Sequence, residues 1–284
     1  MTDLSDLALP LGAARSGRAR YAAAMALYQQ GHLAAEALEI YRICALLDRA
    51  DPGSLLAEAG QPLATALPMA AEVALTVLVG AVDTYLAALP GPGVAEVRQG
   101  LNHWRSSPVT PATPRSNAVL DQHLPAALAQ LEPTHPDLAQ AVAGAAPHLT
   151  WITYDGYGDT IGDRFVQGHA YATLIGEQAP IPARDFDLGL FLIAPHVLYR
   201  DHHHAAPELY APLTGPHGWR FEPDRPLILK PAHEPVWNPP HRPHLTKVGA
   251  TPFLALFGWT RDVQGVAQVI PASDWPALEV LRID

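Results

Sequence analysis

The pattern of apolar residues and the residue types change after Pro147, and this change limits the fold more than any other feature of the sequence. Before it, apolar residues recur at three- and four-residue steps within Ala-, Leu- and Glu-rich segments, which is typical of amphipathic helices. After it, short runs of β-branched and aromatic residues are separated by clusters of Gly, Pro and Asp, and strands are expected at residues 149–154, 170–175, 188–193, 227–229 and 253–259. We therefore expect an α+β chain, with an α-helical region over residues 1–147 and an all-β sandwich or barrel over residues 148–284.

The first region is expected to hold helices at about residues 21–49, 68–89, 94–105, 118–131 and 135–145. Gly31 could divide the first of these helices, and Ser54 is a candidate cap for another helix after the turn at residues 51–53. Residues 106–117 carry three prolines and little apolar content. This composition favours a linker or an extended surface loop.

The bulk properties restrict the partners of the chain. Its 284 residues carry a formal net charge of −10, which disfavours nucleic acid and anionic membranes as partners. Residues 1–17 lack the pattern of a signal peptide, and the most apolar run, residues 73–82, is about half of the ~20 residues that a membrane-spanning helix needs. We expect a cytoplasmic protein without a membrane partner. Cys44, the single cysteine, is expected to be a buried structural residue.

The histidines of the second region suggest a metal site. They are concentrated between His196 and His244, with His202, His203 and His204 in a row. Alternate side chains of a strand share one face, so His202 and His204 should point the same way, and Glu208 and Tyr210 should share that interior if the alternation persists. Two imidazoles and a carboxylate can hold a first-row divalent metal and leave positions open for substrate or water.

A further metal ligand is expected from a neighbouring strand. The segment at residues 238–244 offers His241 and His244. We favour His244, because it follows Pro243 at the expected start of a strand, whereas His241 lies in a proline-rich turn. His203 falls on the opposite strand face and is expected to lie near the surface.

These spacings carry a resemblance to a known family. His202-x-His204-x3-Glu208-x6-Gly215 resembles the first cupin motif, and Pro239-x-His241-x2-His244 resembles the second. The glycines that open the two motifs are replaced by His196 and His233, and His241 stands where the second motif usually has Gly. The resemblance implies a cupin fold (a double-stranded β-helix, or jelly-roll, barrel) over residues 148–284, with one divalent metal, Zn, Fe, Mn, Ni or Co, bound by His202, His204, Glu208 and His244.

Within the cupins, the chain is most similar to the bacterial dimethylsulfoniopropionate (DMSP) lyases. The similar segments are residues 151–158, 168–176, 189–195 and 252–259, with Tyr199 and the His/Glu/Tyr cluster between them, and they cover about residues 149–263. The long helical first region departs from most similar lyases. The resemblance implies a β-elimination that splits DMSP, a zwitterionic sulfonium compound, into acrylate and dimethyl sulfide.

The implied reaction assigns roles to particular residues. The metal would bind the substrate carboxylate and stabilise the charge that develops when the α-proton leaves. Tyr210 is the first candidate for the base, because it shares the face of Glu208 and a nearby cation lowers the pKa of a phenol. Tyr199 is the second candidate, as base or as partner of the substrate carboxylate. Aromatic faces bind sulfonium groups, and the candidates are Trp151, Tyr154, Tyr157 and Trp259.

Two other classes of function remain open on the sequence. A similar ligand set serves other metal-dependent cupin enzymes, such as dioxygenases and isomerases. A non-catalytic cupin that senses a small molecule is the second alternative. The helical region could cover one end of the barrel, form the interface of a homodimer, or both.

Overall fold

The structure is a computed structural model that describes residues 6–7, 9–29, 33–61, 70–110, 113, 115, 117–154, 156 and 158–284, without the side chains of residues 158 and 159. It divides into two compact units, Met1–Ala70 and Ala71–Asp284. The helices that precede residue 147 are therefore shared between the units. Those after Ala70 belong to the same compact unit as the strands.

The first unit contains three helices, α1 (Ser16–Gln29), α2 (Ala35–Cys44) and α3 (Pro52–Glu58). They pack through a small apolar core of Ala24, Leu27, Ala37, Tyr41 and Leu56. The cap of α3 differs from the expectation. Asp51 accepts a hydrogen bond from the Gly53 amide at 2.9 Å and Pro52 opens the helix, whereas Ser54 lies inside the first turn and donates its hydroxyl to Asp51. Asp51 is favoured because Pro at the first helical position needs the residue before it to be extended.

The second unit begins with four helices whose bounds lie close to the expected ones. They are α4 (Ala71–Ala88), α5 (Val94–Trp104), α6 (Ala118–Leu131) and α7 (Pro136–Ala145). In the described part of the chain, α4 is the one helix long and apolar enough to cross a membrane by length and composition alone. Its Leu75, Leu78 and Val82 side chains are fully buried, and α4 packs against α5 and α7.

The described residues between α5 and α6 contact the rest of the unit. The Thr110 amide donates to the Pro180 carbonyl at 2.8 Å, and Arg115 bridges Thr150. Asn117 then caps α6 by accepting a hydrogen bond from the Val119 amide. At Thr110, Arg115 and Asn117 the segment is thus bonded to other parts of its unit.

The strands form two sheets, which confirms the expected helical region followed by a jelly-roll of the cupin type. The first has the order β2-β1-β3-β10-β5-β8 and the second the order β11-β4-β9-β6-β7. All pairs are antiparallel except β1 with β2. Their bounds are β1 (His169–Gly176), β2 (Ile181–Pro182), β3 (Asp187–Ile193), β4 (Leu198–His203), β5 (Glu208–Pro212), β6 (His217–Arg220), β7 (Ile228–Lys230), β8 (Val236–Asn238), β9 (His244–Lys247), β10 (Phe253–Trp259) and β11 (Gln268–Val269).

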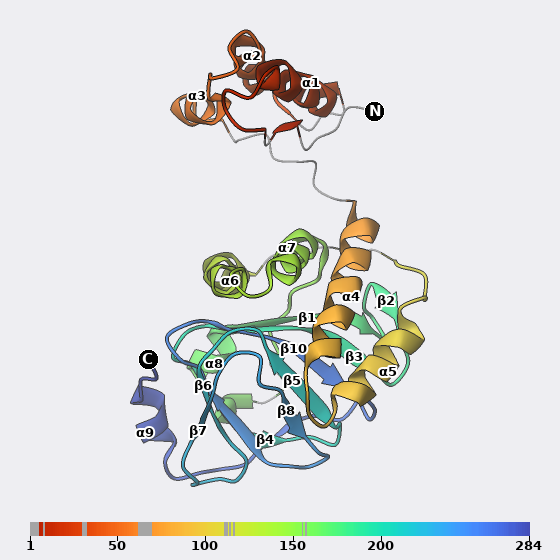
Figure 1. The fold of residues 1–284 in the computed structure, drawn as a ribbon. Helices are drawn as coiled ribbons and strands as arrows, with labels where there is room; N and C mark the ends of the chain where they lie inside the picture. Colours follow the sequence, from red (N-terminus) through yellow and green to blue (C-terminus); the bar gives the residue numbers. More distant parts are fainter. Residues whose placement is uncertain are drawn as a thin grey trace. The chain divides into compact units, whose positions relative to one another are not determined.

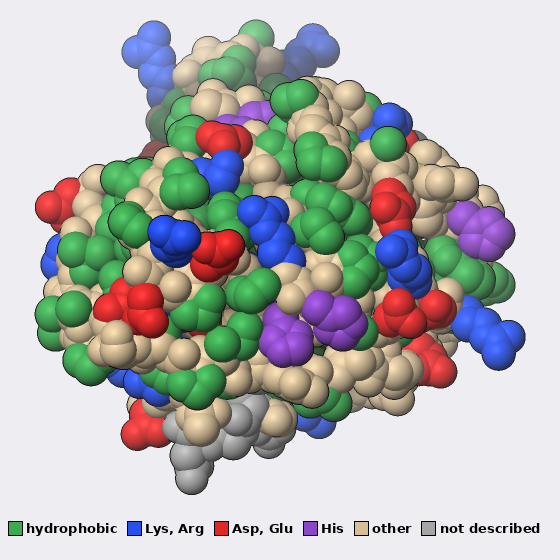
Figure 2. Space-filling view, turned by 90° about the horizontal axis from the view of Figure 1, so that it is seen from below, with side chains coloured by type: hydrophobic (Ala, Val, Ile, Leu, Met, Phe, Trp, Pro, Cys, Tyr) green, Lys and Arg blue, Asp and Glu red, His purple; other side chains and the backbone are tan. Residues whose placement is uncertain are grey.

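Helices cover the barrel from more than one side (Figure 1). Helix α6 packs on β1, β3 and β10 of the first sheet, and α9 (Trp275–Val280) packs on β4 of the second. Two short 3₁₀ helices, Ala146–His148 and Gly158–Ile161, and helix α8 (Asp163–Gln167) connect α7 to β1. On the face that Figure 2 shows, basic and acidic side chains are interspersed rather than gathered by sign.

One of the expected strands does not form. Residues 149–154 make only isolated bridges, through Thr150 and Ile152. The run is apolar because Leu149 and Trp151 are core residues, each 1% exposed, and not because it pairs along a sheet. The other four expected runs are confirmed as parts of β1, β3, β7 and β10.

A buried ion-pair cluster attaches the C-terminal segment to β4. Arg220 on β6 donates to Asp201 on β4 at 2.8 Å and to Asp274 at 3.0 Å, and the Trp275 indole donates to Asp201 at 2.7 Å. Burial disfavours the charged guanidinium, but the two aspartates outweigh it and raise the pKa of Arg220. Because Asp201 lies beside His202, this cluster holds the strand that carries the candidate metal ligands.

Candidate metal centre and active site

Three imidazoles meet inside the barrel. The ligand atoms of His202 and His204 from the β4 segment and of His244 from β9 all lie within 4.8 Å of one another. Their side chains are buried, and His202 pairs with His244 across the two strands. His202 and His204 therefore point to the same side, as the alternation of side chains along a strand predicts. His203 points away from them and lies near His241, with 5.7 Å between the ring centroids.

Each of these three rings is held in the orientation that suits a metal ligand. The Nδ1 atom of each histidine donates to a nearby backbone carbonyl: His202 to Arg200 at 2.8 Å, His204 to Ala206 at 2.8 Å and His244 to Arg242 at 2.9 Å. A neutral imidazole that donates from Nδ1 keeps its lone pair on Nε2. The backbone therefore leaves three Nε2 lone pairs for a shared cation.

Glu208 completes the donor set. Its Oε2 atom lies 3.3 Å from Nε2 of His204 and 3.3 Å from Nε2 of His244. Trp259 donates its indole N–H to Oε1 at 2.8 Å, and the Asn238 amide donates to Oε2 at 3.2 Å. Three imidazole nitrogens and a carboxylate oxygen that face one another are a donor set that fits a divalent metal.

The charges of these groups are coupled. Burial favours the neutral acid of Glu208, but His204 and His244 outweigh it and hold the pKa of the carboxyl well below its usual range. Burial disfavours the imidazolium of His204, and the Glu208 carboxylate outweighs it and raises the pKa of His204. Burial and the two neighbouring histidines lower the pKa of His202. The site therefore presents an ionised carboxylate at neutral pH.

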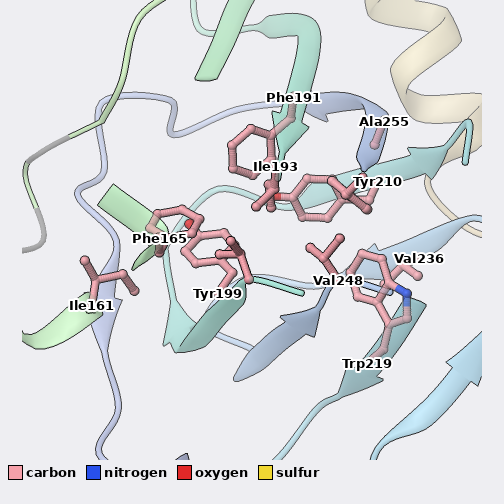
Figure 3. Close-up of a cluster of buried hydrophobic side chains, with 12 residues drawn as sticks. Ile161, Phe165, Phe191, Ile193, Tyr199, Tyr210, Trp219, Val236, Val248 and Ala255 are labelled. Atoms are coloured by element: carbon pink, nitrogen blue, oxygen red, sulfur yellow. The ribbon is translucent and has the colours of Figure 1, made fainter. Parts of the chain in front are cut away.

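A cavity of about 310 Å³ opens beside this centre, and Glu208 is part of its wall. Tyr199 and Tyr210 line it as well, and each is 4% exposed. Figure 3 shows Tyr199 beside Phe165 and Tyr210 beside Phe191 within one apolar cluster. Both candidate bases thus face the same cavity as the candidate metal ligand Glu208.

A bulge in β4 explains how Tyr199 reaches the cavity. Tyr199 pairs with Thr246 and His202 with His244, so one extra residue lies on β4 between these two pairs. Simple alternation would put Tyr199 and His202 on opposite faces, whereas the bulge puts both inside. Their rings stack with centroids 4.0 Å apart.

The four aromatic candidates for substrate binding are not in equivalent places. Tyr154 and Trp259 line the cavity. Trp151 is a core residue whose indole donates to the Ala146 carbonyl at 3.0 Å, and it does not line the cavity. Tyr157 lies outside the described residues. Sequence reasoning missed Tyr171, Phe191 and Phe257, which also line the cavity, because aromatic residues in buried strands look alike whichever face they occupy.

Two further ionisable residues of the cavity wall were not expected. His169 donates from Nδ1 to the Phe165 carbonyl and accepts at Nε2 from the Tyr154 amide, and burial lowers the pKa of His169 to about 4. It is therefore neutral at pH 7. Asp187 opens β3, and burial, with added repulsion from Glu177 and Asp185, raises the pKa of Asp187 to about 6. The only sequence signal was an acid directly before an apolar run.

The raised pKa of Asp187 predicts a pH-dependent stability. Because the folded-state pKa lies above the ordinary value of 3.8, the contribution of this group is most favourable below pH 4 and is lost as the pH rises through 6. Asp187→Asn should therefore raise the free energy of unfolding by about 2–3 kcal/mol at pH 7.5 and by almost nothing below pH 4. Urea titrations at both values test this, followed by tryptophan fluorescence, since all six tryptophans lie in residues 71–284. An equal effect at both values would contradict it.

The sequence is similar to known proteins of one family. A family model described as DMSP lyase matches residues 95–255. The DMSP lyase DddQ of Ruegeria pomeroyi is 29% identical over 146 residues, which cover 49% of this chain and 71% of that protein.

Solved structures resemble the fold. A chain from the crystal structures of the DMSP lyases RdDddP and RnDddQII is 19% identical with a TM-score of 0.54, and the match covers 71% of this chain and all of that chain. The crystal structure of DddQ from Ruegeria pomeroyi is 23% identical with a TM-score of 0.51, and the match covers 72% of this chain and 98% of that chain.

Proposed function

The chain belongs to the DMSP lyase family of carbon–sulfur lyases, and from this we propose that it cleaves DMSP to acrylate and dimethyl sulfide by β-elimination. The observation that carries the proposal is the arrangement of His202, His204, His244 and Glu208 beside a cavity lined by two tyrosines. A divalent metal bound by these four residues would hold the substrate carboxylate and stabilise negative charge on it.

The residues of the cavity supply the remaining steps in this proposal. Tyr210, as the phenolate, removes the α-proton, and the electron pair of that C–H bond becomes the new double bond of acrylate. The bond between the β-carbon and sulfur breaks, and its electron pair leaves with sulfur as neutral dimethyl sulfide. Tyr199 binds the substrate carboxylate. Solvent then takes the proton from Tyr210 and restores the base.

The orientation of Glu208 supports this assignment. Trp259 and Asn238 donate hydrogen bonds to its two oxygens, and Oε2 is directed toward His204 and His244. This orientation supports Glu208 as a metal ligand rather than as the base. The apolar cluster around Tyr199 and Tyr210 excludes water from the reacting carbon, which favours elimination over side reactions.

The decisive experiment is gas chromatography of the headspace above metal-loaded protein and DMSP, performed without oxygen. We expect dimethyl sulfide and acrylate in equal amounts, and no product from protein treated with a chelator. An oxygen requirement would favour a dioxygenase. Ligand binding without turnover would favour a sensor.

A further inference from the structure

The charged side chains among the described residues that line the cavity are acidic. The described residues that line it include Asp187 and Glu208 but no lysine or arginine, and His169 is neutral at pH 7. Glu208 is committed to the histidines of the metal centre. Among the described residues, no hydrogen bond or ion pair engages the Asp187 carboxylate, and the charges that act on it come from Glu177 and Asp185, which repel it. A partly buried carboxylate without a partner is costly unless a ligand supplies the opposite charge.

The register of the first sheet places this carboxylate with respect to the metal centre. Asp187 pairs with Trp259, and Trp259 pairs with Glu208, so the three residues form one row across β3, β10 and β5. Residues paired in register point to the same face, and all three line the cavity. The Cα atoms of Asp187 and Glu208 are therefore roughly 10 Å apart, two strand spacings, and Trp259 occupies the strand position between them.

Gly176 leaves room for the Asp187 side chain in this row. A Cβ atom on Gly176 would lie 2.2 Å from the Asp187 Oδ1 atom, so the absence of a side chain at Gly176 lets the carboxylate lie against β1. The rings of Tyr171 and Phe257, whose centroids are 6.1 Å apart, line the same cavity. One end of the cavity wall thus carries an anion, and aromatic faces lie along it, which is the chemistry that attracts a cation without N–H groups.

We propose that Asp187 is the counter-ion of the substrate's cationic group and selects zwitterions that carry a dialkyl sulfonium or trialkylammonium group. This role rests on the proposed function, because it takes the metal centre as the site of the substrate carboxylate. Two methylene groups separate the charges of DMSP, so this short molecule could extend from the metal centre along Trp259 toward Asp187. A sulfonium has no hydrogen-bond donor, and the carboxylate therefore acts on it by charge alone.

The test uses two ligands of the same shape that differ in one charge. They are 3-(trimethylammonio)propanoate, which is zwitterionic, and 4,4-dimethylpentanoate, in which carbon replaces the ammonium nitrogen. Calorimetry on the metal-loaded full chain gives both dissociation constants for wild type and Asp187→Asn. We expect the ratio of neutral to zwitterionic dissociation constants to fall about tenfold or more in Asp187→Asn. Both ligands carry the same carboxylate, so any effect of the substitution on the binding of that group cancels in this ratio.

Glu177→Gln is the matched control. Glu177 is exposed, outside the cavity wall, and its Oε2 accepts a hydrogen bond from Gln264 at 2.7 Å, which a glutamine oxygen can also accept. It also repels Asp187, so the control removes a nearby charge without removing the cavity carboxylate. We expect its ratio to stay within about twofold of wild type, because an exposed charge is screened by solvent.

Turnover of DMSP, measured in parallel, separates this inference from the proposed function. In Asp187→Asn the KM for DMSP should rise about tenfold, with a smaller change in kcat, because the cation is bound before the bond breaks. If the ratio of dissociation constants falls in Asp187→Asn but wild type forms no dimethyl sulfide, the lyase proposal is wrong. Asp187 would then still be a binding site for a cationic group. Dimethyl sulfide formation with an unshifted ratio would overturn the role of Asp187.

Discussion

His204→Ala should lose metal and dimethyl sulfide formation together. His204 Nε2 lies 3.3 Å from Glu208 Oε2, and its Nδ1 donates to the Ala206 carbonyl, so its free lone pair is directed at the other candidate ligands. Loss of groups that merely orient a ligand lowers metal affinity about 10–100-fold, so loss of the ligand itself should exceed a hundredfold. Elemental analysis after dialysis, together with headspace dimethyl sulfide, measures both effects on one sample.

His203→Ala is the control for this experiment, because it removes an imidazole from the adjacent position. His203 lies on the other face of β4, near His241 and away from the three converging histidines. We expect one metal per chain and turnover within about twofold of wild type, because His203 is not part of the converging donor set. If His203→Ala lost the metal and His204→Ala kept it, the assignment of the centre would be wrong.

The convergence of the four candidate ligands could be predicted from the sequence because it depends on local rules. Alternation along a strand separates His203 from its two neighbours, and a proline before His244 marks the start of a strand. The helices were predictable for a similar reason, since the glycines and prolines between helices mark their ends. These signals lie within a few residues of the features that they predict.

The rest of the site depends on pairing between distant strands, which the sequence does not display. The bulge that turns Tyr199 inward is defined by its register against Thr246 and His244. Asp187 meets the row of Trp259 and Glu208 only because β10 lies between β3 and β5. Both faces of these strands are buried, so their apolar runs carry no alternation from which the inner face could be identified.

Tyr210→Phe should keep the metal and lose turnover. Tyr210 follows Glu208 by two residues on β5 and lines the cavity, and the hydrogen bonds that Glu208 accepts from Trp259 and Asn238 do not involve it. Loss of a general base lowers the rate by about 10²–10⁴-fold. We therefore expect kcat to fall by that factor while elemental analysis still finds one metal per chain. Tyr199→Phe is the matched variant, because Tyr199 is equally buried in the same cluster.

The roles of the two tyrosines separate when proton removal is measured without bond cleavage. The carbon analogue 4-methylpentanoate has the shape of DMSP but no leaving group, so exchange of its α-protons in D2O, followed by NMR, reports the base alone. If Tyr210 is the base, Tyr210→Phe loses this exchange, whereas Tyr199→Phe keeps it and binds the analogue more weakly, because Tyr199 then serves the carboxylate. Full exchange and full lyase activity in Tyr210→Phe, with both lost in Tyr199→Phe, would transfer the base to Tyr199. Tyr199 could serve as the base because the bulge in β4 brings it to the same cavity as Tyr210.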